Sequence, residues 1–418
     1  MPQYRAAWLL PVSQPPIRDG WVRIERGRVA AFGPRRPGEP SPAGEIDLGS
    51  VAILPGLVNA HTHLELSWMR GRLAPTDDFP GWIRDVIALQ RGRARGNAAD
   101  AADAERAIRG AIAEARRTGT VLFGDISNTL ASSPGLIDSG SAAVVFHELI
   151  GFKGGQASTI VTDALERLRQ QPTDHRIRYA LAAHAPYSVS PELFTKIRQA
   201  CAGNSHARCS VHLGESRAET EFLREGRGPW RTLLEDLGAW DPEWAAPGCG
   251  GAEYLDRLGF LDDRLLVVHG VQCDREDLER LRTRDVTLVT CPRGNMLTGA
   301  GKPPVGAFYS AGVRVAIGTD SLASVPDLNL FSELAALRRL APAVPARTLL
   351  ESATIHGARA LGFETDFGTI QAGKHASIIA VAVPEGVLDV EEHLVQGIAP
   401  ADISHVEMRP DVHESRAE

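Results

Sequence analysis

The sequence predicts an α/β protein: a (β/α)8 TIM barrel with a small β-sandwich domain built from both chain ends. Short apolar runs alternate with amphipathic segments through the middle of the chain, and both ends show the alternating pattern of strands. Residues able to bind metals follow several of the apolar runs. Because 418 residues exceed what one core usually holds, we expect a β-domain of residues 1–52 plus 366–418 and a barrel of residues 53–365.

The two ends of the chain carry the strands of the predicted β-domain. Residues 21–32 alternate between apolar and polar side chains and predict a β-hairpin. After a loop rich in proline, glycine and serine, a short strand leads into the buried segment 52–58. Near the other end, residues 368–370 and 377–383 predict two further strands, and the polar segment 407–418 is expected to fray.

Eight apolar runs predict the strands of the barrel. They span residues 53–58, 121–125, 143–147, 179–183, 209–212, 265–269, 287–290 and 314–317. Amphipathic patterns between them predict helices, for example over residues 98–117 and 191–200. In barrels of this kind the carboxyl ends of the strands form the face that carries the active site, so the residues that end these runs are the candidates for chemistry.

Composition limits the classes of partner. A net charge of −7 argues against nucleic acid or an anionic membrane as the main partner, because both require a basic surface. No apolar run reaches the roughly 20 residues of a membrane span. The five cysteines include no C-x-x-C pair, so reduced thiols in a cytoplasmic protein are expected rather than a disulfide framework or a zinc knot. A small molecule is the favoured ligand.

Two of the strand ends carry pairs of metal-ligand residues. His61 and His63 close an apolar strand and, two positions apart, share one of its faces, so both can bind one ion. A lone histidine is more often structural, but this H-x-H pattern favours ligation. His212 and Glu215 form H-x-x-E, and Gly214 between them indicates a tight turn. The imidazole can then bind the ion while the carboxylate reaches water bound to it.

Two further strand ends complete the constellation. His269 ends the run 265–269, and Asp320 follows the run 314–317. Asp320 has an alternative role as the cap of a following helix. Because parallel strands aim their last residues at one edge of a sheet, these side chains can meet at one point. The pattern predicts a catalytic metal site.

These residues carry a resemblance. The segment Pro55 to His63, the H-x-x-E of His212 and Glu215, His269, and Gly318-Thr319-Asp320-Ser321 resemble the amidohydrolase superfamily, in its cytosine deaminase, chlorohydrolase and adenosine-type aminohydrolase branch. The match covers nearly the whole chain, because the segment 368–374 also follows the family pattern. The sequence departs from the family at Ser377, where many relatives carry an acidic residue.

The resemblance implies which residues hold the metal. Relatives with two metals use a carboxylated lysine, or a glutamate, at the end of strand four; residues 178–186 offer neither, and none of the four lysines ends a later strand. One divalent ion is therefore expected. The implied ligands are His61, His63, His212 and Asp320, a set that suits zinc and that iron or manganese also accepts.

The resemblance also implies a mechanism. The ion would lower the pKa of a bound water toward about 7. Glu215 would take the proton of this water and pass it to a ring nitrogen of the substrate, His269 would polarise or orient the attacked centre, and Asp320 would accept the second proton. Attack of hydroxide on an amidine-like carbon would then expel ammonia.

Two further segments narrow the resemblance. Leu64 to Trp68 directly after the H-x-H, and His184 to Pro191 after strand four, look like the aminodeoxyfutalosine deaminases and the related adenosine, methylthioadenosine and S-adenosylhomocysteine deaminases. His184 is the preferred substrate-binding candidate, with a structural role as the alternative. Glu65 would bind a purine edge or a sugar hydroxyl, or else form a buried ion pair with an arginine.

Three aromatic residues and two arginines are weaker candidates. Trp68 and Trp82, with Phe79, lie on the segment after strand one and would either cover the substrate as a lid or pack the outer helices. Arg217 and Arg224 follow Glu215 and would contact a negative group of the substrate.

The leading hypothesis is a zinc-dependent aminohydrolase that acts on a 6-aminopurine nucleoside such as aminodeoxyfutalosine. Two alternatives stand beside it. The same metal site would cleave a cyclic amide or a chlorinated triazine, or the barrel would be non-catalytic; the last predicts loss of a ligand or of the proton-shuttling acid, and all are present. A homodimer is expected by analogy with related enzymes.

Overall fold

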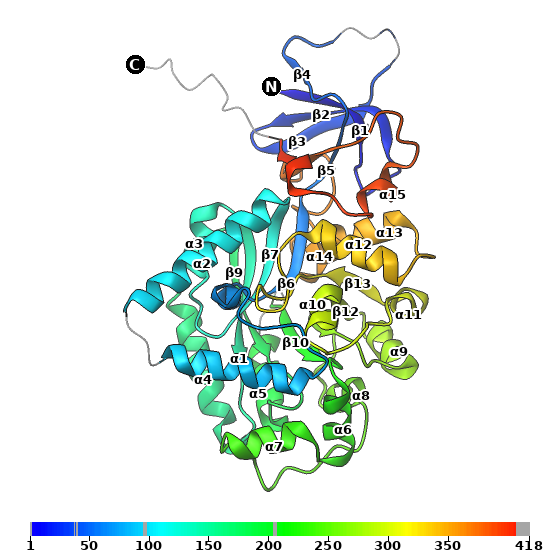
Figure 1. The fold of residues 1–418 in the computed structure, drawn as a ribbon. Coiled ribbons are helices and arrows are strands. Elements are labelled where there is room, and N and C mark those ends of the chain that lie inside the picture. The colour runs from blue at the N-terminus through cyan, green and yellow to red at the C-terminus, as the bar shows by residue number, and fades with distance from the viewer. Residues whose placement is uncertain (1, 37, 39–40, 95–97, 204–206, 407–418) are drawn as a thin grey trace.

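The computed structural model describes residues 2–36, 38, 41–94, 98–203 and 207–406. Figure 1 shows a barrel surrounded by helices, with a smaller β-domain against one end of it. The N-terminal strands, in dark blue, and the C-terminal elements, in red, lie together in this β-domain (Figure 1). The predicted barrel with a domain built from both chain ends is confirmed.

The barrel is one sheet of eight parallel strands in sequence order. Its strands are β6 (Leu57–Thr62), β7 (Thr120–Ser127), β8 (Ala142–Leu149), β9 (Ile177–Ala183), β10 (Cys209–Leu213), β11 (Leu265–His269), β12 (Thr287–Thr290) and β13 (Arg314–Ile317). The first and last strands meet through a bridge between Thr62 and Asp320, which closes the barrel. Seven of the eight predicted strands are present at the predicted positions, whereas the first, residues 53–58, covers the boundary between a strand of the β-domain and β6.

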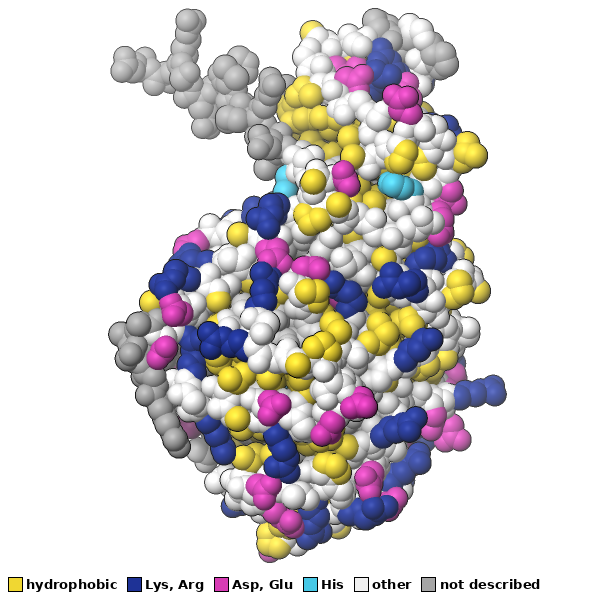
Figure 2. Space-filling model, in the orientation of Figure 1, with side chains coloured by type: hydrophobic (Ala, Val, Ile, Leu, Met, Phe, Trp, Pro, Cys, Tyr) yellow, Lys and Arg dark blue, Asp and Glu magenta, His cyan; other side chains and the backbone are white. Residues whose placement is uncertain are grey.

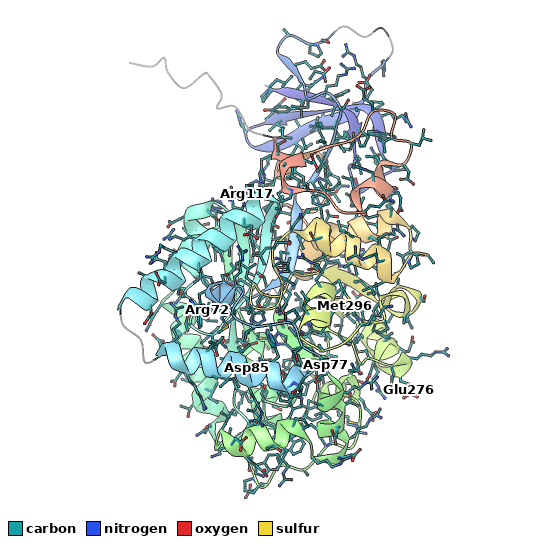
Figure 3. The ribbon with its side chains drawn as sticks, in the orientation of Figure 1. Arg72, Asp77, Asp85, Arg117, Glu276 and Met296 are labelled. Carbon is teal, nitrogen blue, oxygen red and sulfur yellow. The ribbon has the colours of Figure 1, made fainter. Side chains whose placement is uncertain are left out.

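Alternation along the strands fills the barrel with apolar side chains. Val58 and Ala60 of β6 share a core cluster with Val144 and Phe146 of β8 and with the equivalent residues of other strands. Residues of opposite parity face the surrounding helices. Side chains occupy the space between strands and helices throughout (Figure 3).

Helices cover the outside of the barrel. They are α1 (Phe79–Ala94), α2 (Ala98–Arg117), α3 (Ser133–Ser139), α4 (Ala157–Arg169), α5 (Pro191–Ala202), α6 (Arg217–Glu225), α7 (Pro229–Asp236), α8 (Gly251–Arg257), α9 (Arg275–Thr283), α10 (Pro292–Leu297), α11 (Val305–Ser310), α12 (Leu330–Leu340), α13 (Ala346–Ser352) and α14 (Ile355–Ala360). The last helix, α15 (Val390–Leu394), lies with the other C-terminal elements at the β-domain (Figure 1). Three short 3₁₀ helices span Leu64–Met69, Gly154–Gln156 and Pro400–Asp402. The helices predicted over 98–117 and 191–200 are α2 and α5.

Local chemistry explains where α5 begins. Pro191 occupies its first turn, where no backbone N–H is needed, and the Ser190 hydroxyl accepts a hydrogen bond from the Leu193 N–H.

Within the described part of the chain, no helix combines the length and apolar character required to cross a bilayer. Basic and acidic side chains are interspersed over the face shown in Figure 2.

The β-domain is one sheet of seven hydrogen-bonded strands. They are β1 (Gln3–Leu9), β2 (Ile17–Glu25), β3 (Arg28–Pro34), β4 (Glu45–Asp47), β5 (Val51–Pro55), β14 (Ile378–Ala382) and β15 (Ile403–His405). The predicted hairpin is the antiparallel pair β2 and β3. β14 pairs antiparallel with β5, which joins the C-terminal segment to the N-terminal strands.

Two of the predicted strands are wrong in detail. Residues 53–58 do not form one strand, because Gly56 separates β5 of the β-domain from β6 of the barrel. A Cβ at Gly56 would lie 2.3 Å from a methyl carbon of Val121, so only glycine allows the chain to cross there. Residues 368–370 form no strand; Gly368 has a φ of 87°, and the segment turns instead. The segment 407–418 lies outside the described residues.

Candidate metal and catalytic site

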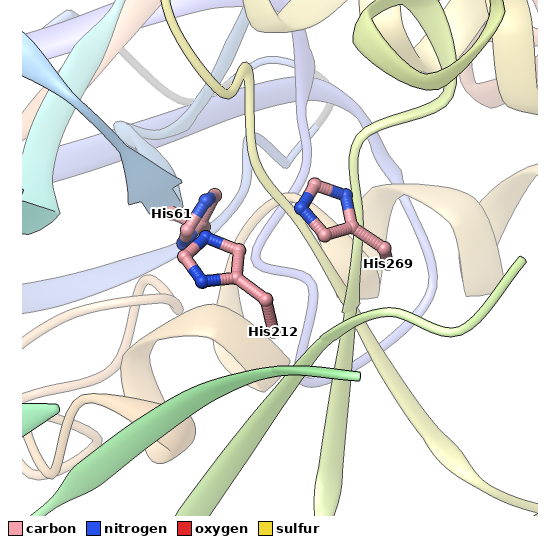
Figure 4. Close-up of side chains that lie close together, drawn as sticks. All are labelled: His61, His212 and His269. Carbon is pink, nitrogen blue, oxygen red and sulfur yellow. The ribbon is translucent and has the colours of Figure 1, made fainter. Parts of the chain in front are cut away.

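Four imidazole rings converge where the barrel strands end. His61 lies near the end of β6 and His63 just after it. His212 lies near the end of β10, and His269 is the last residue of β11. The ring centroid of His61 lies 4.9 Å from that of His63, 5.0 Å from that of His212 and 5.6 Å from that of His269. Figure 4 shows the rings of His61, His212 and His269 facing one region from separate strands. Separate strand ends thus meet at one point, as the sequence predicts.

The distances between candidate ligand atoms suit one metal ion. Oδ1 of Asp320 lies 3.8 Å from Nε2 of His61 and 3.7 Å from Nε2 of His63. Nε2 of His212 lies 3.4 Å from Nε2 of His63. Bonds of about 2.0–2.1 Å in a tetrahedron separate the ligand atoms by about 3.3 Å. His61, His63 and Asp320 need only small adjustments to hold a single ion, and His212 lies next to His63.

His61 gives an independent indication of a metal. Its side chain is fully buried, and neither ring nitrogen has a hydrogen-bond partner. Such unpartnered buried polar atoms are rare in folded proteins because they forgo hydrogen bonds to water. Burial and the neighbouring rings also hold the pKa of His61 and His63 well below the ordinary value, so both imidazoles are neutral, as a metal requires.

Hydrogen bonds orient the third histidine. Nδ1 of His212 lies 2.9 Å from the carbonyl oxygen of His184 and donates to it, which leaves the Nε2 lone pair directed at His63 and the other ligands. Burial is the main cause that lowers the pKa of His212 to about 4. Its ring is therefore also neutral.

Backbone contacts hold Asp320, the predicted carboxylate ligand, against the first barrel strand. The N–H of His63 and the hydroxyl of Thr62 donate to the Asp320 carbonyl at 3.0 and 2.7 Å. Ser324 donates to Oδ2 of Asp320 at 2.6 Å, which leaves Oδ1 to face the histidines. Asp320 itself has a φ of 60°. The residue thus occupies an unusual backbone conformation that the surrounding contacts stabilise.

Glu215 and His269 form a pair beside the ligands. Oε1 of Glu215 lies 3.3 Å from Nε2 of His269. Nδ2 of Asn295 donates to Nδ1 of His269 at 2.9 Å, so the proton of the neutral ring is on Nε2. Burial, together with the charges of Asp320 and Glu219, raises the pKa of Glu215 well above its ordinary value. A buried carboxyl of this kind can both hold and release a proton.

Glu219 fixes the turn that presents Glu215. Its carboxylate accepts hydrogen bonds from the N–H of Gly214 at 2.8 Å and of Glu215 at 3.1 Å. Gly214 has a φ of 61°, as the tight turn predicted between His212 and Glu215 requires. Burial raises the pKa of Glu219 to about 7.

His184 lies next to the predicted metal ligands. The centroid of its ring is 5.2 Å from that of His212, and its Nδ1 lies 2.6 Å from the Ser188 hydroxyl. Burial lowers the pKa of His184 to about 4. Of the four predicted substrate-binding residues, His184 is the one whose ring contacts a predicted ligand.

Glu65 binds the loop after β7. Its carboxylate accepts hydrogen bonds from the N–H groups of Asn128, Thr129 and Ala131 at 3.0–3.2 Å. The ion pair with an arginine that the sequence left open does not occur among the described residues. The carboxylate holds this loop in place.

The two tryptophans pack against other side chains. Arg72 and Arg93 lie over the Trp68 ring at 5.1 and 4.5 Å. Trp82 stacks on Phe79 with a centroid distance of 6.2 Å, and both side chains are buried. This arrangement favours the packing alternative over the lid.

The arginines expected to contact a negative substrate group lie on the surface. Arg217 and Arg224 are both exposed residues of α6, the helix that follows Glu215. Arg224 lines a narrow cavity of about 20 Å³ beside Gly214 and Glu219.

Glu148 was missed in the sequence. It lies near the end of β8, its Oε1 is buried without a hydrogen-bond partner, and that atom is 3.5 Å from Nδ1 of His212. Its other oxygen accepts a hydrogen bond from Nδ2 of Asn128 at 2.9 Å. A carboxylate near the end of an apolar run was the available indication. Asn295 and Ser324 were also missed, because their roles depend on contacts between distant segments.

Comparison with known proteins agrees with this geometry. The model of the amidohydrolase family matches residues 52–406. A 5-methylthioadenosine/S-adenosylhomocysteine deaminase of Moorella thermoacetica is 29% identical over 98% of this chain and 93% of its own.

Two solved structures share the fold across nearly the whole chain. An adenosine deaminase of Xanthomonas campestris with bound zinc gives a TM-score of 0.79 at 27% identity, covering 96% of this chain and 90% of its own. Helicobacter pylori aminofutalosine deaminase in complex with methylthio-coformycin gives a TM-score of 0.81 at 26% identity. The match covers 97% of this chain and 98% of the aminofutalosine deaminase chain. The resemblance found in the sequence is confirmed: the chain belongs to the amidohydrolase family.

Proposed function

We propose that this protein is a metal-dependent aminohydrolase that releases ammonia from a 6-aminopurine nucleoside. One observation carries the proposal: His61, His63 and Asp320 place ligand atoms within 4.8 Å of one another, His212 lies next to His63, and the buried Glu215 lies beside His269 with its pKa raised. The names of the related proteins, which include deaminases of adenosine and its 5′ derivatives, support the choice of substrate class.

His61, His63, His212 and Asp320 would hold one divalent ion, with zinc as the proposed metal because it suits this ligand set and is bound in the Xanthomonas structure. Such an ion lowers the pKa of water and supplies hydroxide at neutral pH. A single ion is favoured because Nδ1 of His212 donates to the His184 carbonyl and cannot serve a second one.

The residues around the ligands divide the proton transfers between them. Glu215 takes a proton from the attacking water and gives it to the ring nitrogen beside the attacked carbon. Nε2 of His269 carries a proton, so it donates to the oxygen that adds to this carbon. Asp320 accepts the remaining proton of that oxygen and returns it to the leaving amino group. Oxygen replaces nitrogen at the carbon, and ammonia leaves.

Substrate recognition, location and assembly complete the proposal. His184 would bind the purine edge, with Glu65, Trp68 and Trp82 as further predicted contacts. The partner is a small heterocyclic molecule. A cytoplasmic location is supported by five free thiols, which suit a reducing compartment. A homodimer remains a prediction.

A deamination screen tests the proposal. Zinc-loaded protein is incubated with adenosine, 5′-methylthioadenosine, S-adenosylhomocysteine, cytosine, a cyclic amide and a chlorinated triazine, and ammonia and chloride are measured. We expect ammonia from the adenine nucleosides. Turnover of the cyclic amide or the triazine, with none of any amino-heterocycle, would support the alternative enzyme; no turnover of any compound would support the non-catalytic barrel.

A further inference from the structure

We propose that a basic cavity where the barrel meets the β-domain binds a small organic phosphate, at a site separate from the metal centre. The cavity has a volume of about 550 Å³ and is named the basal cavity below. It is bounded by the first residues of β7 and β8 and by residues of β14 and β15. The predicted metal ligands lie at the opposite, carboxyl ends of the barrel strands. The barrel and the β-domain adjoin in Figure 1.

Positive side chains outnumber negative ones in the basal cavity. Four arginines and three histidines line it, with Asp366 as the one acid among its described lining residues. Two of the arginines have carboxylate partners: Arg28 pairs with Asp366 and Arg176 pairs with Asp174, each at 2.9 Å. The other two, Arg116 and Arg178, form no ion pair with a described carboxylate. They leave the cavity with an excess of positive charge.

Arg116 is a half-buried cation with a second cation beside it. Its Nη1 donates to the Ser139 carbonyl and, at 3.1 Å, to the Ser141 hydroxyl. A Cβ added at Gly140 would lie 3.9 Å from this nitrogen and 3.1 Å from Nη1 of Arg176, so two guanidinium groups converge on one glycine. Burial and the charge of Arg176 lower the pKa of Arg116. An anion bound between the two groups would offset their repulsion.

Arg178 presents the second unpaired guanidinium group. It is exposed and lies over the Phe363 ring at 3.7 Å. A Cβ added at Gly362 would lie 3.2 Å from Nη1 of Arg178 and 3.0 Å from Nη2 of Arg208, so here too a second cation is close. The charges of Asp366 and Glu364 act on Arg178 from beyond ion-pair distance. Planar guanidinium groups suit phosphate because two parallel N–H groups can donate to two of its oxygens.

A buried hydroxyl in the wall gives an independent indication of a ligand. Thr120, the first residue of β7, lines the basal cavity and is fully buried. Its Oγ1 has no hydrogen-bond partner among the described residues. Buried polar atoms without a partner are rare in folded proteins. A phosphate oxygen, or a water molecule held by it, would supply the missing acceptor.

The rest of the wall favours an organic ligand over a free phosphate ion. Val121 and Ala142 of the barrel and Ile378 and Val406 of the β-domain line the cavity with apolar surface. The volume lies within the roughly 300–1,000 Å³ of sites for small organic molecules. The cavity therefore accommodates an apolar or aromatic body in addition to the phosphate, and burial of that body would add to the affinity.

Three probes separate the phosphate from the organic body. Zinc-loaded protein is titrated by calorimetry with uridine diphosphate, inorganic pyrophosphate and uridine, none of which carries an amino group that the proposed reaction could release. We expect uridine diphosphate to bind with a Kd at least about threefold below that of pyrophosphate, and uridine to show no measurable binding. Because the ligand binds the folded protein, uridine diphosphate should also raise Tm.

Substitutions test the arginines. Arg116→Met and Arg178→Met should each raise the Kd of uridine diphosphate about tenfold or more, since each removes charge-assisted hydrogen bonds. Ser377→Asp adds a carboxylate to the cavity wall without removing an arginine and should also raise it. Arg178 is exposed and Ser377 partly exposed, so these two variants test the site even if Arg116→Met does not fold. Arg117→Met is the control at an exposed arginine of α2, labelled in Figure 3, and should leave Kd unchanged.

A further variant separates the basal cavity from the metal site. His63→Ala should bind uridine diphosphate as tightly as the wild type does, because His63 lies at the other end of the barrel. Loss of binding in His63→Ala would place the probe at the metal site and overturn the inference. Equal Kd in the wild type, Arg178→Met and Ser377→Asp would overturn it as well, as would no binding of uridine diphosphate. Pyrophosphate that binds as tightly as uridine diphosphate would overturn the claim for an organic ligand.

Discussion

His61 is the residue that demands a metal most strongly. An unpartnered buried polar atom costs about 1–3 kcal/mol, and His61 has two. A bound ion would satisfy one of them and would also separate the ring nitrogens of His63 and His212, which face each other at 3.4 Å. Binding of the proposed ion would therefore also stabilise this end of the barrel.

The Glu215→Gln variant tests the proton carrier. Glutamine keeps the shape of the side chain but cannot take a proton from water, so kcat should fall by about 10²–10⁴-fold while the metal content stays unchanged. Elemental analysis and an ammonia assay give both quantities. Glu221→Gln, on the outer face of the same region and paired with Arg227, should retain activity. Full turnover by Glu215→Gln would disprove its role.

Asp125 should make stability depend on pH. Burial raises its pKa to about 8, whereas an exposed aspartate has about 3.9. Between these values the folded state binds the extra proton, so the free energy of unfolding falls as pH rises, by at most about 1.4 kcal/mol per pH unit.

Asparagine at position 125 would not titrate, and it can still accept from the Leu64 N–H as Asp125 does. The stability of Asp125→Asn relative to wild type should therefore improve from pH 5 to pH 8, as measured by urea unfolding of the zinc-loaded proteins. Parallel curves for the two proteins would contradict the shifted pKa.

At the scale of single residues, the sequence predicted the side chains that end strands and missed those that orient them. His61, His212 and Asp320 could be found because their place at strand ends follows from local pattern. Asn295 could not be found in this way, because it contacts His269 from another part of the barrel. Glu219 could not be found either, because it acts through hydrogen bonds to backbone N–H groups. Neither contact leaves a pattern in the neighbouring residues.

At the scale of elements, close contact between the first and last barrel strands shapes the site. A Cβ added at Gly318 would lie 2.5 Å from the carbonyl oxygen of His61. Gly318→Ala should therefore displace a metal ligand and lower both zinc affinity and the free energy of unfolding, the latter by about 1–3 kcal/mol.

Gly110→Ala is the matched control for this substitution. Gly110 lies inside α2, and no atom lies within 4 Å of the position that a Cβ would take there, so alanine should stabilise the protein by about 0.5–1 kcal/mol. Thermal unfolding of both variants, with zinc titrations, measures the difference. Normal zinc affinity in Gly318→Ala would show that the two strands can separate without cost.

Some strand boundaries cannot be predicted from the pattern of apolar residues. An apolar run ending at Val58 predicts one strand, but the run continues through Gly56 from one sheet into another. Both strands are buried, so their patterns are the same, and only the contact of Gly56 with Val121 in the folded barrel reveals the break. The segment 368–370 likewise has the composition of a strand, but the chain turns at Gly368, which has a φ of 87°.

At the scale of the whole molecule, the β-domain depends on both ends of the chain. We propose the division into residues 1–52 plus 366–418 and residues 53–365. β14 pairs with β5, which leads directly into β6, the strand that carries the proposed ligand His61. The packing of the C-terminal segment thus supports the start of the barrel.

Removal of residues 366–418 should expose the apolar strand β5 and the core around it. Ile53 and Leu54 would lose β14 as a neighbour and become an open sheet edge. We expect the truncated chain to aggregate or to bind less than one zinc per chain, as measured by size-exclusion chromatography with elemental analysis. A monodisperse truncated protein with full zinc content would show that the barrel is independent.

A metal titration with an activity readout tests the central claim most directly. The protein is stripped with a chelator, zinc is returned in steps, and ammonia release from 5′-methylthioadenosine is followed, with His63→Ala as the ligand-deficient control. Activity should be absent after stripping, rise linearly and level off at one zinc per chain, and it should not return in His63→Ala. Full activity in the stripped protein, or a plateau at two zinc ions, would contradict the single-metal site.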